Sequence, residues 1–338
     1  MADDSAIEIS GTVNLLIEIE GKKYLHKFLI MPSLKSALLI GVDLWAKLGI
    51  TLKPPPRSRP SNVATTTKIT SEGLNTQTPE EQQKLKEFLE RELKKFEKVQ
   101  GPTDRAQHRI RLKTDQPIKQ RYRPRNPAMQ AVIDQEVEKM INNGIIEPSR
   151  SAWSSPIVVV KKKDGTHRFC IDFRKVNEVT EKDAYPLPHV TATLDKLRGA
   201  RYLSTLDLIK GYWQVPLQPE SRPITAFTVP GRGLMQFRVM PFGLHSAPAT
   251  FQRLLDEVLG PELEPNVLVY LDDIIIISQS FEQHLQHLHE VFRRLREAKL
   301  RVNPEKCHFC REELRYLGHV INRQGIRTDP EKVSAVAN

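Results

Sequence analysis

The stretch Val267-Leu-Val-Tyr-Leu-Asp-Asp-Ile-Ile-Ile-Ile277 decides the fold. Its apolar, mostly β-branched residues predict strands over 267–271 and 274–278, joined at a hairpin tip that carries Asp272 and Asp273. Asp tolerates turn geometry, so one interpretation is a plain turn. Asn-Gly or Asp-Gly is more usual at such a tip, however, and two neighbouring anions repel each other unless a cation neutralises them. The stretch alone leaves a turn and a metal site equally supported.

A third carboxylate decides between these interpretations. Asp207 lies in the β pattern Tyr202–Leu208, close to its end. Three carboxylates on two strands can hold two divalent ions about 4 Å apart, which is the arrangement that nucleotidyl transfer requires. Mg²⁺ suits an all-oxygen, partly hydrated site. We therefore expect Asp207, Asp272 and Asp273 to be catalytic and to bind two Mg²⁺ ions, for which Mn²⁺ could substitute.

The composition favours an intracellular protein with a polyanionic partner. The 338 residues suffice for two or three domains, and 51 Lys and Arg against 41 Asp and Glu give a net charge of +10. Three cysteines are too few for a secreted disulfide scaffold. We find no signal peptide, and no apolar run of about 18 residues that a membrane span would need.

The first part of the chain predicts a small unit followed by a linker and a helix. Residues 7–50 alternate apolar and polar side chains, which indicates a β-rich unit. From residue 54 to residue 78 the chain is rich in Pro, Arg, Ser and Thr, as in a flexible linker. Thr78-Pro79-Glu80-Glu81 has the form of a capping box, so we expect an amphipathic helix over 79–98.

Beyond Ser149, strands and helices interleave without a repeat. This order favours an α+β fold over a doubly wound parallel sheet. The Asp164-Gly165 pair predicts a two-residue hairpin turn between strands 157–161 and 168–173. Further elements are expected as helices over 127–143, 247–259 and 282–299 and as a last strand over 313–321.

Several segments together resemble the reverse transcriptases of gypsy-type LTR retrotransposons. The resemblance begins with Asp207-Leu-Ile-Lys-Gly-Tyr-Trp-Gln and Tyr270-Leu-Asp-Asp and runs from about Gln107 to Asn338 in the expected order. The ordered set is far more specific than one motif. Its other members are Gly144-Ile-Ile-Glu-Pro-Ser, Ser155-Pro-Ile-Val-Val-Val-Lys-Lys-Lys-Asp-Gly, Arg168-Phe-Cys-Ile-Asp-Phe-Arg-Lys-Val-Asn, Met240-Pro-Phe-Gly-Leu-His-Ser-Ala-Pro-Ala-Thr-Phe-Gln, Lys306-Cys307 and Tyr316-Leu-Gly-His-Val-Ile-Asn-Arg-Gln-Gly-Ile.

The resemblance implies a right-hand polymerase of the α+β class, with fingers and a four-stranded type of palm sheet backed by helices. Fingers and palm would occupy 107–323, preceded by the helix and a connector over 79–106 and followed by the start of a truncated thumb over 324–338. We expect low processivity from such a thumb. Leu38-Leu-Ile-Gly-Val-Asp-Leu44 resembles the second half of a retropepsin-like protease, so residues 1–53 would be a partial protease unit. Its catalytic Asp-Thr-Gly is missing, and we expect no proteolysis.

The resemblance also implies roles for further residues. Lys162 and Arg168 would grip the incoming triphosphate, with a solvated basic edge strand as the alternative for Lys161 to Lys163. Tyr212 would exclude a ribose 2′-hydroxyl, with a core tyrosine as the alternative. Phe242 and Leu271 would lie against the nucleotide. The remaining expected site is a primer grip, with a plain core strand as the alternative, formed by Leu317, Gly318 and His319.

The function implied is an RNA-directed DNA polymerase that adds dNTPs to a primer on an RNA or DNA template. The other implied partners are the remaining domains of a Pol polyprotein, without a membrane. The implied location is the cytoplasm, in virus-like particles, with the nucleus as a second compartment. A catalytically idle remnant that binds nucleic acid or a protein is the competing hypothesis. Cys307-x-x-Cys310 lacks further zinc ligands, and His284, His287 and His289 are expected on a solvated helix face.

Overall fold

The computed structural model of the chain describes residues 11–19, 22–30, 77–124, 126–161 and 167–328. The chain forms two compact units, residues 1–70 and 71–338. In the first unit, β1 (Gly11–Ile19) and β2 (Lys22–Ile30) pair as an antiparallel hairpin. This hairpin confirms strands within the predicted β-rich region. The rest of that region and nearly all of the predicted linker lie outside the described residues.

A four-stranded antiparallel sheet is the largest sheet of the second unit, with the strand order β11-β6-β10-β9. Its strands are β6 (Tyr202–Leu206), β9 (Val267–Tyr270), β10 (Asp273–Ser278) and β11 (His308–Arg311). The even-numbered isoleucines of β10 lie in one hydrophobic core and the odd-numbered ones lie in another. Successive side chains of a strand point to opposite faces, so an unbroken isoleucine run suits a strand between two cores.

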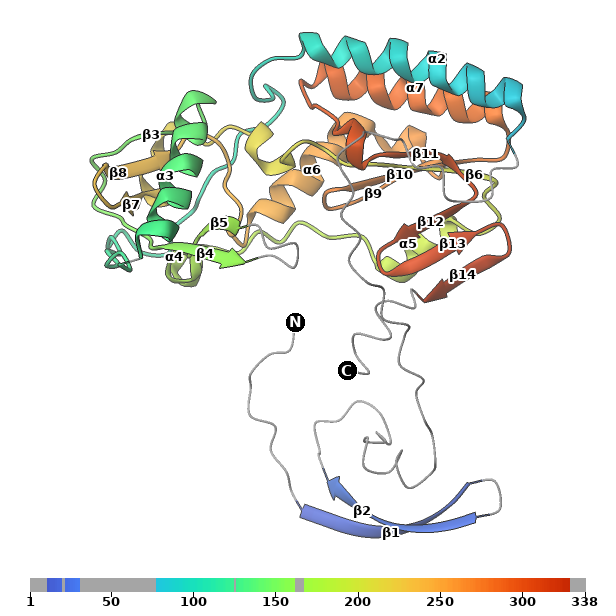
Figure 1. The fold of residues 1–338 in the computed structure, drawn as a ribbon, viewed down its shortest axis with the longest axis horizontal. Coiled ribbons are helices and arrows are strands. Elements are labelled where there is room, and N and C mark those ends of the chain that lie inside the picture. The colour runs from blue at the N-terminus through green and yellow to red at the C-terminus, as the bar shows by residue number, and fades with distance from the viewer. Residues whose placement is uncertain (1–10, 20–21, 31–76, 125, 162–166, 329–338) are drawn as a thin grey trace. The chain divides into compact units, whose positions relative to one another are not determined.

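Helices cover one face of this sheet, as Figure 1 shows. α6 (Ala247–Leu259) and α7 (Phe281–Glu297) contribute their apolar stripes to the core that holds the even-numbered isoleucines, and α2 (Pro79–Lys94) runs beside α7. The core on the opposite face contains residues of α5 (Val190–Lys196) and of a small three-stranded sheet. The predicted α+β class is therefore confirmed.

The small sheet corrects one prediction. In place of a single strand over 313–321, the structure has a hairpin of β12 (Glu313–Tyr316) and β13 (His319–Asn322), which β14 (Gly325–Thr328) extends. Leu317 and Gly318 form the turn with φ angles of 49° and 77°. The single-strand prediction is wrong because Leu317 continues the apolar pattern through the turn.

The helix predicted over 79–98 is confirmed as α2 and a 3₁₀ turn, η1 (Lys95–Lys98). Thr78 Oγ1 accepts the Glu81 N–H at 3.2 Å, and the Glu81 carboxylate accepts the Thr78 N–H at 3.0 Å, so the predicted capping box is present. The side chain of Glu92 on α2 is 1% exposed and lies 3.0 Å from the Arg296 guanidinium of α7. This buried ion pair joins the two helices.

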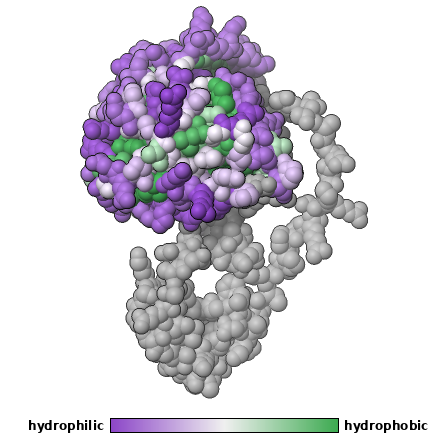
Figure 2. Space-filling model, turned by 90° about the vertical axis from the view of Figure 1, so that its left-hand side faces the viewer, coloured by the Kyte–Doolittle hydropathy of each residue, from purple (hydrophilic) through white to green (hydrophobic). Residues whose placement is uncertain are grey.

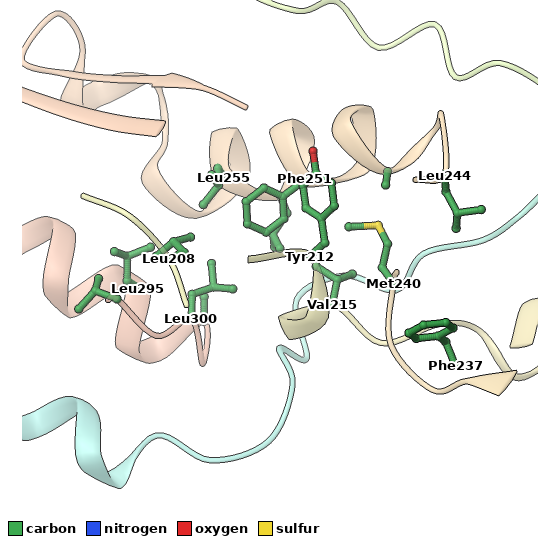
Figure 3. Close-up of a cluster of buried hydrophobic side chains, with 14 of the residues drawn as sticks. Leu208, Tyr212, Val215, Phe237, Met240, Leu244, Phe251, Leu255, Leu295 and Leu300 are labelled. Atoms are coloured by element: carbon green, nitrogen blue, oxygen red, sulfur yellow. The ribbon is translucent and has the colours of Figure 1, made fainter. Parts of the chain in front are cut away.

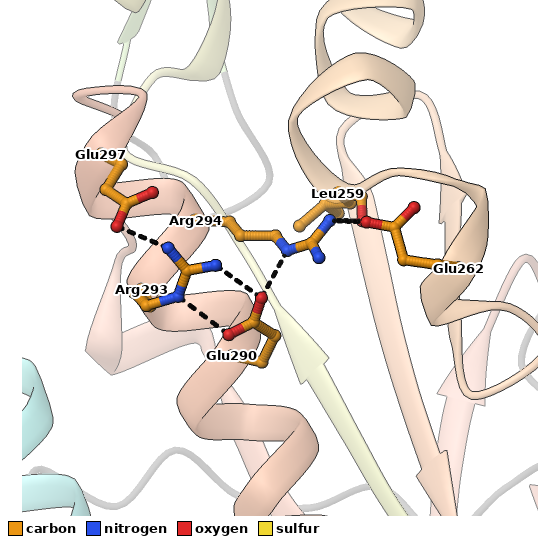
Figure 4. Close-up of polar contacts among 6 residues, drawn as sticks. All are labelled: Leu259, Glu262, Glu290, Arg293, Arg294 and Glu297. Carbon is orange, nitrogen blue, oxygen red and sulfur yellow. Dashed lines mark hydrogen bonds and ion pairs between the residues drawn. The ribbon is translucent and has the colours of Figure 1, made fainter.

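Apolar and charged contacts fix α6 and α7. Figure 3 shows Tyr212, Phe251 and Met240 in the core beside leucines of both helices. At the surface, Arg293 and Arg294 both donate to Glu290 and hold its pKa down at about 2. Arg294 also donates to the Leu259 carbonyl at 2.6 Å and to Glu262, so α7 is tied to the chain that leaves α6 (Figure 4).

A further group of elements lies between residues 127 and 237. α3 (Pro127–Asn142) confirms a predicted helix, and β4 (Ile157–Lys161) and β5 (His167–Ile171) confirm the predicted hairpin strands. The outer face at this end of the unit is mainly hydrophilic, with small separate apolar patches (Figure 2). The sequence analysis did not predict α5, β11 or β14. It also did not predict β3 (Ile146–Pro148), β7 (Phe227–Val229), β8 (Gly233–Phe237), α4 (Arg174–Val179), η2 (Gly211–Gln214), η3 (Pro219–Thr225), η4 (Pro261–Leu263) and η5 (Pro304–Lys306). None of the helices in the described part is long and apolar enough to cross a membrane.

The prediction of a solvated histidine face on α7 is wrong for His284, whose exposed fraction is 0%. Its ring nitrogens lie 2.6 Å from Ser204 Oγ of β6 and 3.0 Å from Ser278 Oγ of β10. Burial lowers the pKa of His284 to about 3, so the ring is neutral at physiological pH. The neutral ring can donate one hydrogen bond and accept another, and it thereby links α7 to both central strands.

We expect the free energy of unfolding to fall as the pH decreases from about 6.5 towards 3. The unfolded chain binds a proton on His284 in this range that the native state excludes, so stability present above the unfolded pKa is lost below it. At about pH 5, His284 should lower the free energy of unfolding by roughly 2 kcal/mol relative to neutral pH. Urea denaturation at about pH 7.5 and about pH 5 measures the loss. It should shrink in His284→Gln but not in the half-exposed control His289→Gln, and equal losses in all three proteins would contradict the assignment.

Candidate active site

The β9–β10 hairpin places the acidic pair. Tyr270 and Asp273 are paired at the ends of the two strands, so Leu271 and Asp272 form the tip, one residue earlier than predicted. Leu271 has a φ of 55°. This left-handed conformation costs a non-glycine residue roughly 1–2 kcal/mol. It persists where the surrounding structure holds the residue in place.

Gln252 of α6 is the residue that holds this tip, and its exposed fraction is 0%. Its Oε1 accepts the Leu271 N–H at 2.7 Å, and its Nε2 donates to Asp256 Oδ1 at 2.9 Å. The Tyr185 hydroxyl donates to the other oxygen of Asp256 at 2.7 Å. The sequence analysis missed Gln252, although a glutamine among the apolar residues of a predicted helix was the signal that could have found it.

The pairing of β6 with β10 brings Asp207 to the same place. Ile274 is opposite Leu206 in this antiparallel pair, so Asp207 and Asp273 follow at the same end of the sheet. Loss of solvation, with the charges of Asp273 and Asp207, raises the pKa of Asp272 to about 6, and loss of solvation and Asp207 also raise the pKa of Asp273. The carboxylates of Asp272 and Asp273 are solvent-exposed, yet the protein around them removes part of the water that would solvate their charges. The three predicted acidic residues are therefore neighbours that repel one another.

Carboxylate oxygens are suitable ligands for a divalent cation, but these side chains are not oriented to bind one ion together. Within the described ranges, no group of three His, Cys, Asp or Glu side chains is placed to hold a metal ion. Asp207 Oδ2 instead lies 3.7 Å from Lys306 Nζ. Three neighbouring carboxylates form an all-oxygen donor set of the kind that Mg²⁺ prefers. Binding would require rotation of these side chains.

The two cysteines of the Cys307-x-x-Cys310 pattern form hydrogen bonds with residues of β6 or next to it. Cys307 Sγ accepts the Asp207 N–H at 3.4 Å, and the Cys310 N–H donates to Ser204 Oγ at 2.9 Å. Burial raises the pKa of Cys307 to about 11 and that of Cys310 to about 12. Both therefore remain thiols at neutral pH.

An aromatic cluster lies beside the acidic residues. The Tyr212 ring stacks on Phe242 with 5.1 Å between centroids and meets the edge of Phe251 at 5.3 Å. Burial and the charge of Asp272 raise the pKa of Tyr212, which places the tyrosine close to that carboxylate. Phe242 stays 36% exposed. Gly211 permits this packing, since a Cβ there would lie 2.8 Å from Phe251 Cζ.

The remaining predicted site residues are placed less completely. Arg168 is exposed on β5 opposite Val160 and forms no ion pair with a described residue, whereas Lys162 lies outside the described residues. The Leu317–Gly318 turn follows Tyr316, whose pKa is raised by burial and by the charge of Asp273. His319 Nδ1 donates to the Leu317 carbonyl at 3.1 Å. The β12–β13 hairpin therefore adjoins the acidic end of the sheet.

We expect Gln252→Leu to lower the free energy of unfolding by about 1–3 kcal/mol, because the Leu271 N–H loses its partner. Urea denaturation measures the change. Gln130→Leu is the matched control, since Gln130 forms the same type of bond to a residue four positions later, Asp134, at 3.1 Å on α3. That variant should lose only a few tenths of a kcal/mol. Equal losses in the two variants would show that Gln252 does not hold the tip.

We expect Asp272→Asn to raise the free energy of unfolding at about pH 7.5 in EDTA. The native pKa of Asp272 lies above its unfolded value, so the native state is favoured when the carboxyl is protonated and loses that advantage as the pH rises through about 6. Mg²⁺ should then stabilise the wild type more than the variant. Thermal unfolding with and without Mg²⁺ measures both effects. Asp115→Asn, at an exposed aspartate, is the control, and an identical Mg²⁺ response in all three proteins would contradict a metal site.

Known proteins resemble this chain in sequence. Residues 160–321 match the reverse transcriptase (RNA-dependent DNA polymerase) family. The chain is 38% identical over 259 residues to the retrovirus-related Pol polyprotein from transposon 297 of Drosophila melanogaster, an alignment that covers 75% of this chain and 24% of the relative. It is 39% identical over 233 residues to the corresponding polyprotein from transposon gypsy of the same species, covering 67% and 22%. The chain thus spans about a quarter of the length of these relatives.

Solved structures resemble it as well. The foamy viral protease-reverse transcriptase in complex with an RNA/DNA hybrid has a TM-score of 0.69 and 25% identity, covering 97% of this chain and 44% of that one. The same viral protein in complex with dsDNA has a TM-score of 0.69 and 28% identity, covering 78% and 55%. The acidic hairpin, the sheet that holds it and the sequence and structural similarities all indicate the same family. The chain belongs to the reverse transcriptases and contains the reverse transcriptase region of a gypsy-like LTR retrotransposon Pol polyprotein.

Proposed function

We propose that this chain is the polymerising core of the enzyme, an RNA-directed DNA polymerase that adds dNTPs to a primer on an RNA or DNA template. The observation that carries the proposal is the meeting of Asp207, Asp272 and Asp273 at one end of the central sheet. Loss of solvation, together with the negative charge of the neighbouring carboxylates, raises the pKa values of Asp272 and Asp273. Ionised carboxylates are unfavourable in this environment, and their presence is explained if the site binds divalent cations.

The three aspartates would hold two Mg²⁺ ions, for which Mn²⁺ could substitute. Bound ions of this kind lower the pKa of an attacking hydroxyl and neutralise charge on the transferred phosphate. Gln252 keeps the hairpin tip in its left-handed conformation and thereby fixes the position of Asp272. Lys306, which contacts Asp207 without a metal, would give up this ion pair when the carboxylate turns towards an ion.

The residues around the acidic cluster would select and orient the nucleotide. The Tyr212 ring, fixed between Phe242 and Phe251, would leave no room for a 2′-hydroxyl and so favour deoxynucleotides. The exposed surface of Phe242 and the tip residue Leu271 would contact the sugar and the base. Arg168 on β5 and Lys162 would bind the triphosphate, because guanidinium and ammonium groups form strong charge-assisted bonds with phosphate oxygens.

The proposed domain arrangement follows from these roles. The central sheet and its helices would be the palm, and α3 with the β3–β8 and β4–β5 strands would be the fingers, both within residues 107–323. Leu317, Gly318 and His319 would form the primer grip, next to the carboxylates. Residues 1–53 would be a partial retropepsin-like unit without proteolytic activity, joined through the linker 54–78 and the segment 79–106. Residues 324–338 would begin the thumb.

Nucleic acid is the proposed partner, along with other domains of the Pol polyprotein. The foamy viral relatives were solved in complex with an RNA/DNA hybrid and with dsDNA, and the net charge of +10 on this chain suits the same class of ligand. Contacts to phosphates would dominate such binding, so the affinity should fall steeply as the salt concentration rises.

Primer extension tests the proposal. The purified chain, a primed homopolymer RNA, Mg²⁺ and the complementary dNTP should give extended primer. Asp272→Asn should lower the rate by at least about 1000-fold, which corresponds to roughly 4 kcal/mol of transition-state stabilisation, while the control Asp115→Asn keeps wild-type activity. Arg168→Gln should mainly raise the KM for the dNTP.

The competing hypothesis predicts a different pattern. A chain that binds the primed template in a filter or gel assay but extends no primer with either Mg²⁺ or Mn²⁺ would be an idle nucleic-acid-binding remnant. Extension that survives in Asp272→Asn would also contradict the proposed site.

A further inference from the structure

A pocket of about 520 Å³ lies just past Asp207, at the turn that leads from β6 into η2. Four cationic residues line it: Lys210, Arg222, Arg238 and Arg301. None of its described lining residues is acidic. Its volume is in the range of pockets that enclose one small molecule, which is smaller than a channel for a nucleic-acid duplex would need.

The positive charge of this pocket is only partly balanced. Glu147 lies 3.5 Å from the guanidinium of Arg222 and 3.5 Å from that of Arg238, so one carboxylate serves two cations. Arg301 and Lys210 form no ion pair within the described part of the chain. The Lys210 ammonium rests 4.1 Å from the centre of the Trp213 ring, a cation–π contact that leaves the net charge unchanged.

Unused hydrogen-bond donors gather around the same pocket. Among the described residues, Trp213 Nε1, Arg222 Nε and Arg301 Nε are buried without a hydrogen-bond partner, and all three belong to lining residues. A buried donor without a partner costs about 1–3 kcal/mol. The surplus consists of donors only, which suits a ligand that carries only acceptors. The three atoms are shielded from solvent, so small rotations of these side chains would be needed to reach such a ligand.

The backbone of Lys210 adds a second sign of a functional site. Its φ of 47° and ψ of 49° are left-handed, a conformation that costs a residue with a side chain roughly 1–2 kcal/mol. Strain of this kind gathers at ligand sites, where the surrounding structure maintains it. Here it directs the lysine over Trp213 at the wall of the pocket.

The other large pocket differs from this one in the charges that line it. That pocket, of about 620 Å³, is also rich in arginine, but Glu181, Asp183 and Glu257 line it as well. Its Arg253 is already bound to both oxygens of Asp183 at 2.9 Å. Paired charges of both signs do not select an anion, whereas the described lining of the pocket beside Lys210 contains cations and free donors and no acidic residue.

We propose that the pocket lined by Lys210, Arg222, Arg238 and Arg301 binds a free, multiply charged phosphate chain, either inorganic triphosphate or the triphosphate tail of a nucleotide. Phosphate oxygens are acceptors only and form bidentate bonds with guanidinium groups. The site is separate from the proposed triphosphate grip of Lys162 and Arg168. It does not depend on the proposed polymerase activity, because neither metal nor primer takes part in the binding.

Isothermal titration calorimetry of the full chain with sodium tripolyphosphate in EDTA tests this site. We expect one ion to bind per chain. Arg301→Gln should weaken binding by about 10-fold or more, as expected for the loss of a charged hydrogen bond. The hydrogen bonds that Arg301 makes with Gln214 and Ile209 involve its backbone only, so the variant should fold. Lys210→Gln is a second, independent variant with the same expected direction.

Titration with metal-free ATP distinguishes the two proposed ligands, inorganic triphosphate and the triphosphate tail of a nucleotide. Tighter binding of ATP than of tripolyphosphate, lost in Arg301→Gln, assigns the pocket to a nucleotide, and equal affinities assign it to the phosphate chain alone. Arg168→Gln and Arg109→Gln, the latter in the other large pocket, should bind like the wild type.

Four results would overturn the proposal. These are absence of binding, unchanged binding in both Arg301→Gln and Lys210→Gln, loss of binding in Arg168→Gln, and displacement of tripolyphosphate by an oligonucleotide without terminal phosphates. The last result would assign the pocket to a nucleic-acid backbone. Since the measurement excludes metal and primer, it can fail while primer extension succeeds, and the reverse also holds.

Discussion

Three carboxylates that repel one another at the end of a single sheet are the constraint on which this structure depends. Loss of solvation and the charges of Asp273 and Asp207 raise the pKa of Asp272 to about 6, so its ionised form is unfavourable here. Two hydrophobic cores, one on each face of β10, prevent the strands from moving apart to relieve the repulsion. A strained, repulsive hairpin tip therefore sits on a rigid base, which is the arrangement that precise positioning of a ligand requires.

Buried hydrogen bonds hold individual residues of the site on this rigid base. The Gln252 side chain links α6 to the Leu271 backbone, and His284 joins α7 to both β6 and β10. Each of these side chains is fully buried, so each contact forms where water cannot replace it. Lys306 is different, because its ammonium is exposed and can leave Asp207 at little cost. The supports of the site are thus fixed, while the group that neutralises Asp207 is replaceable.

The sequence predicted the regular elements well where periodicity and caps agreed. The Thr78 capping box, the α6 helix and the β9–β10 strands follow from local patterns, and the structure confirms them. Predictions failed where tertiary contacts decide. Leu317 is apolar and yet forms a turn, and His284 looks solvated in a charged helix but fills a buried gap between two serines. The role of Gln252 depends on a backbone N–H nineteen residues away, and neither periodicity nor propensity records such a partner.

The position of bound metal is the most direct test of the acidic cluster as a metal site. Crystals of the chain soaked with Mn²⁺ and a dNTP can be measured at the manganese absorption edge. We expect anomalous density between Asp207, Asp272 and Asp273, with the Asp207 carboxylate turned away from Lys306. Manganese bound elsewhere, or an Asp207–Lys306 pair that persists beside an empty acidic cluster, would contradict it.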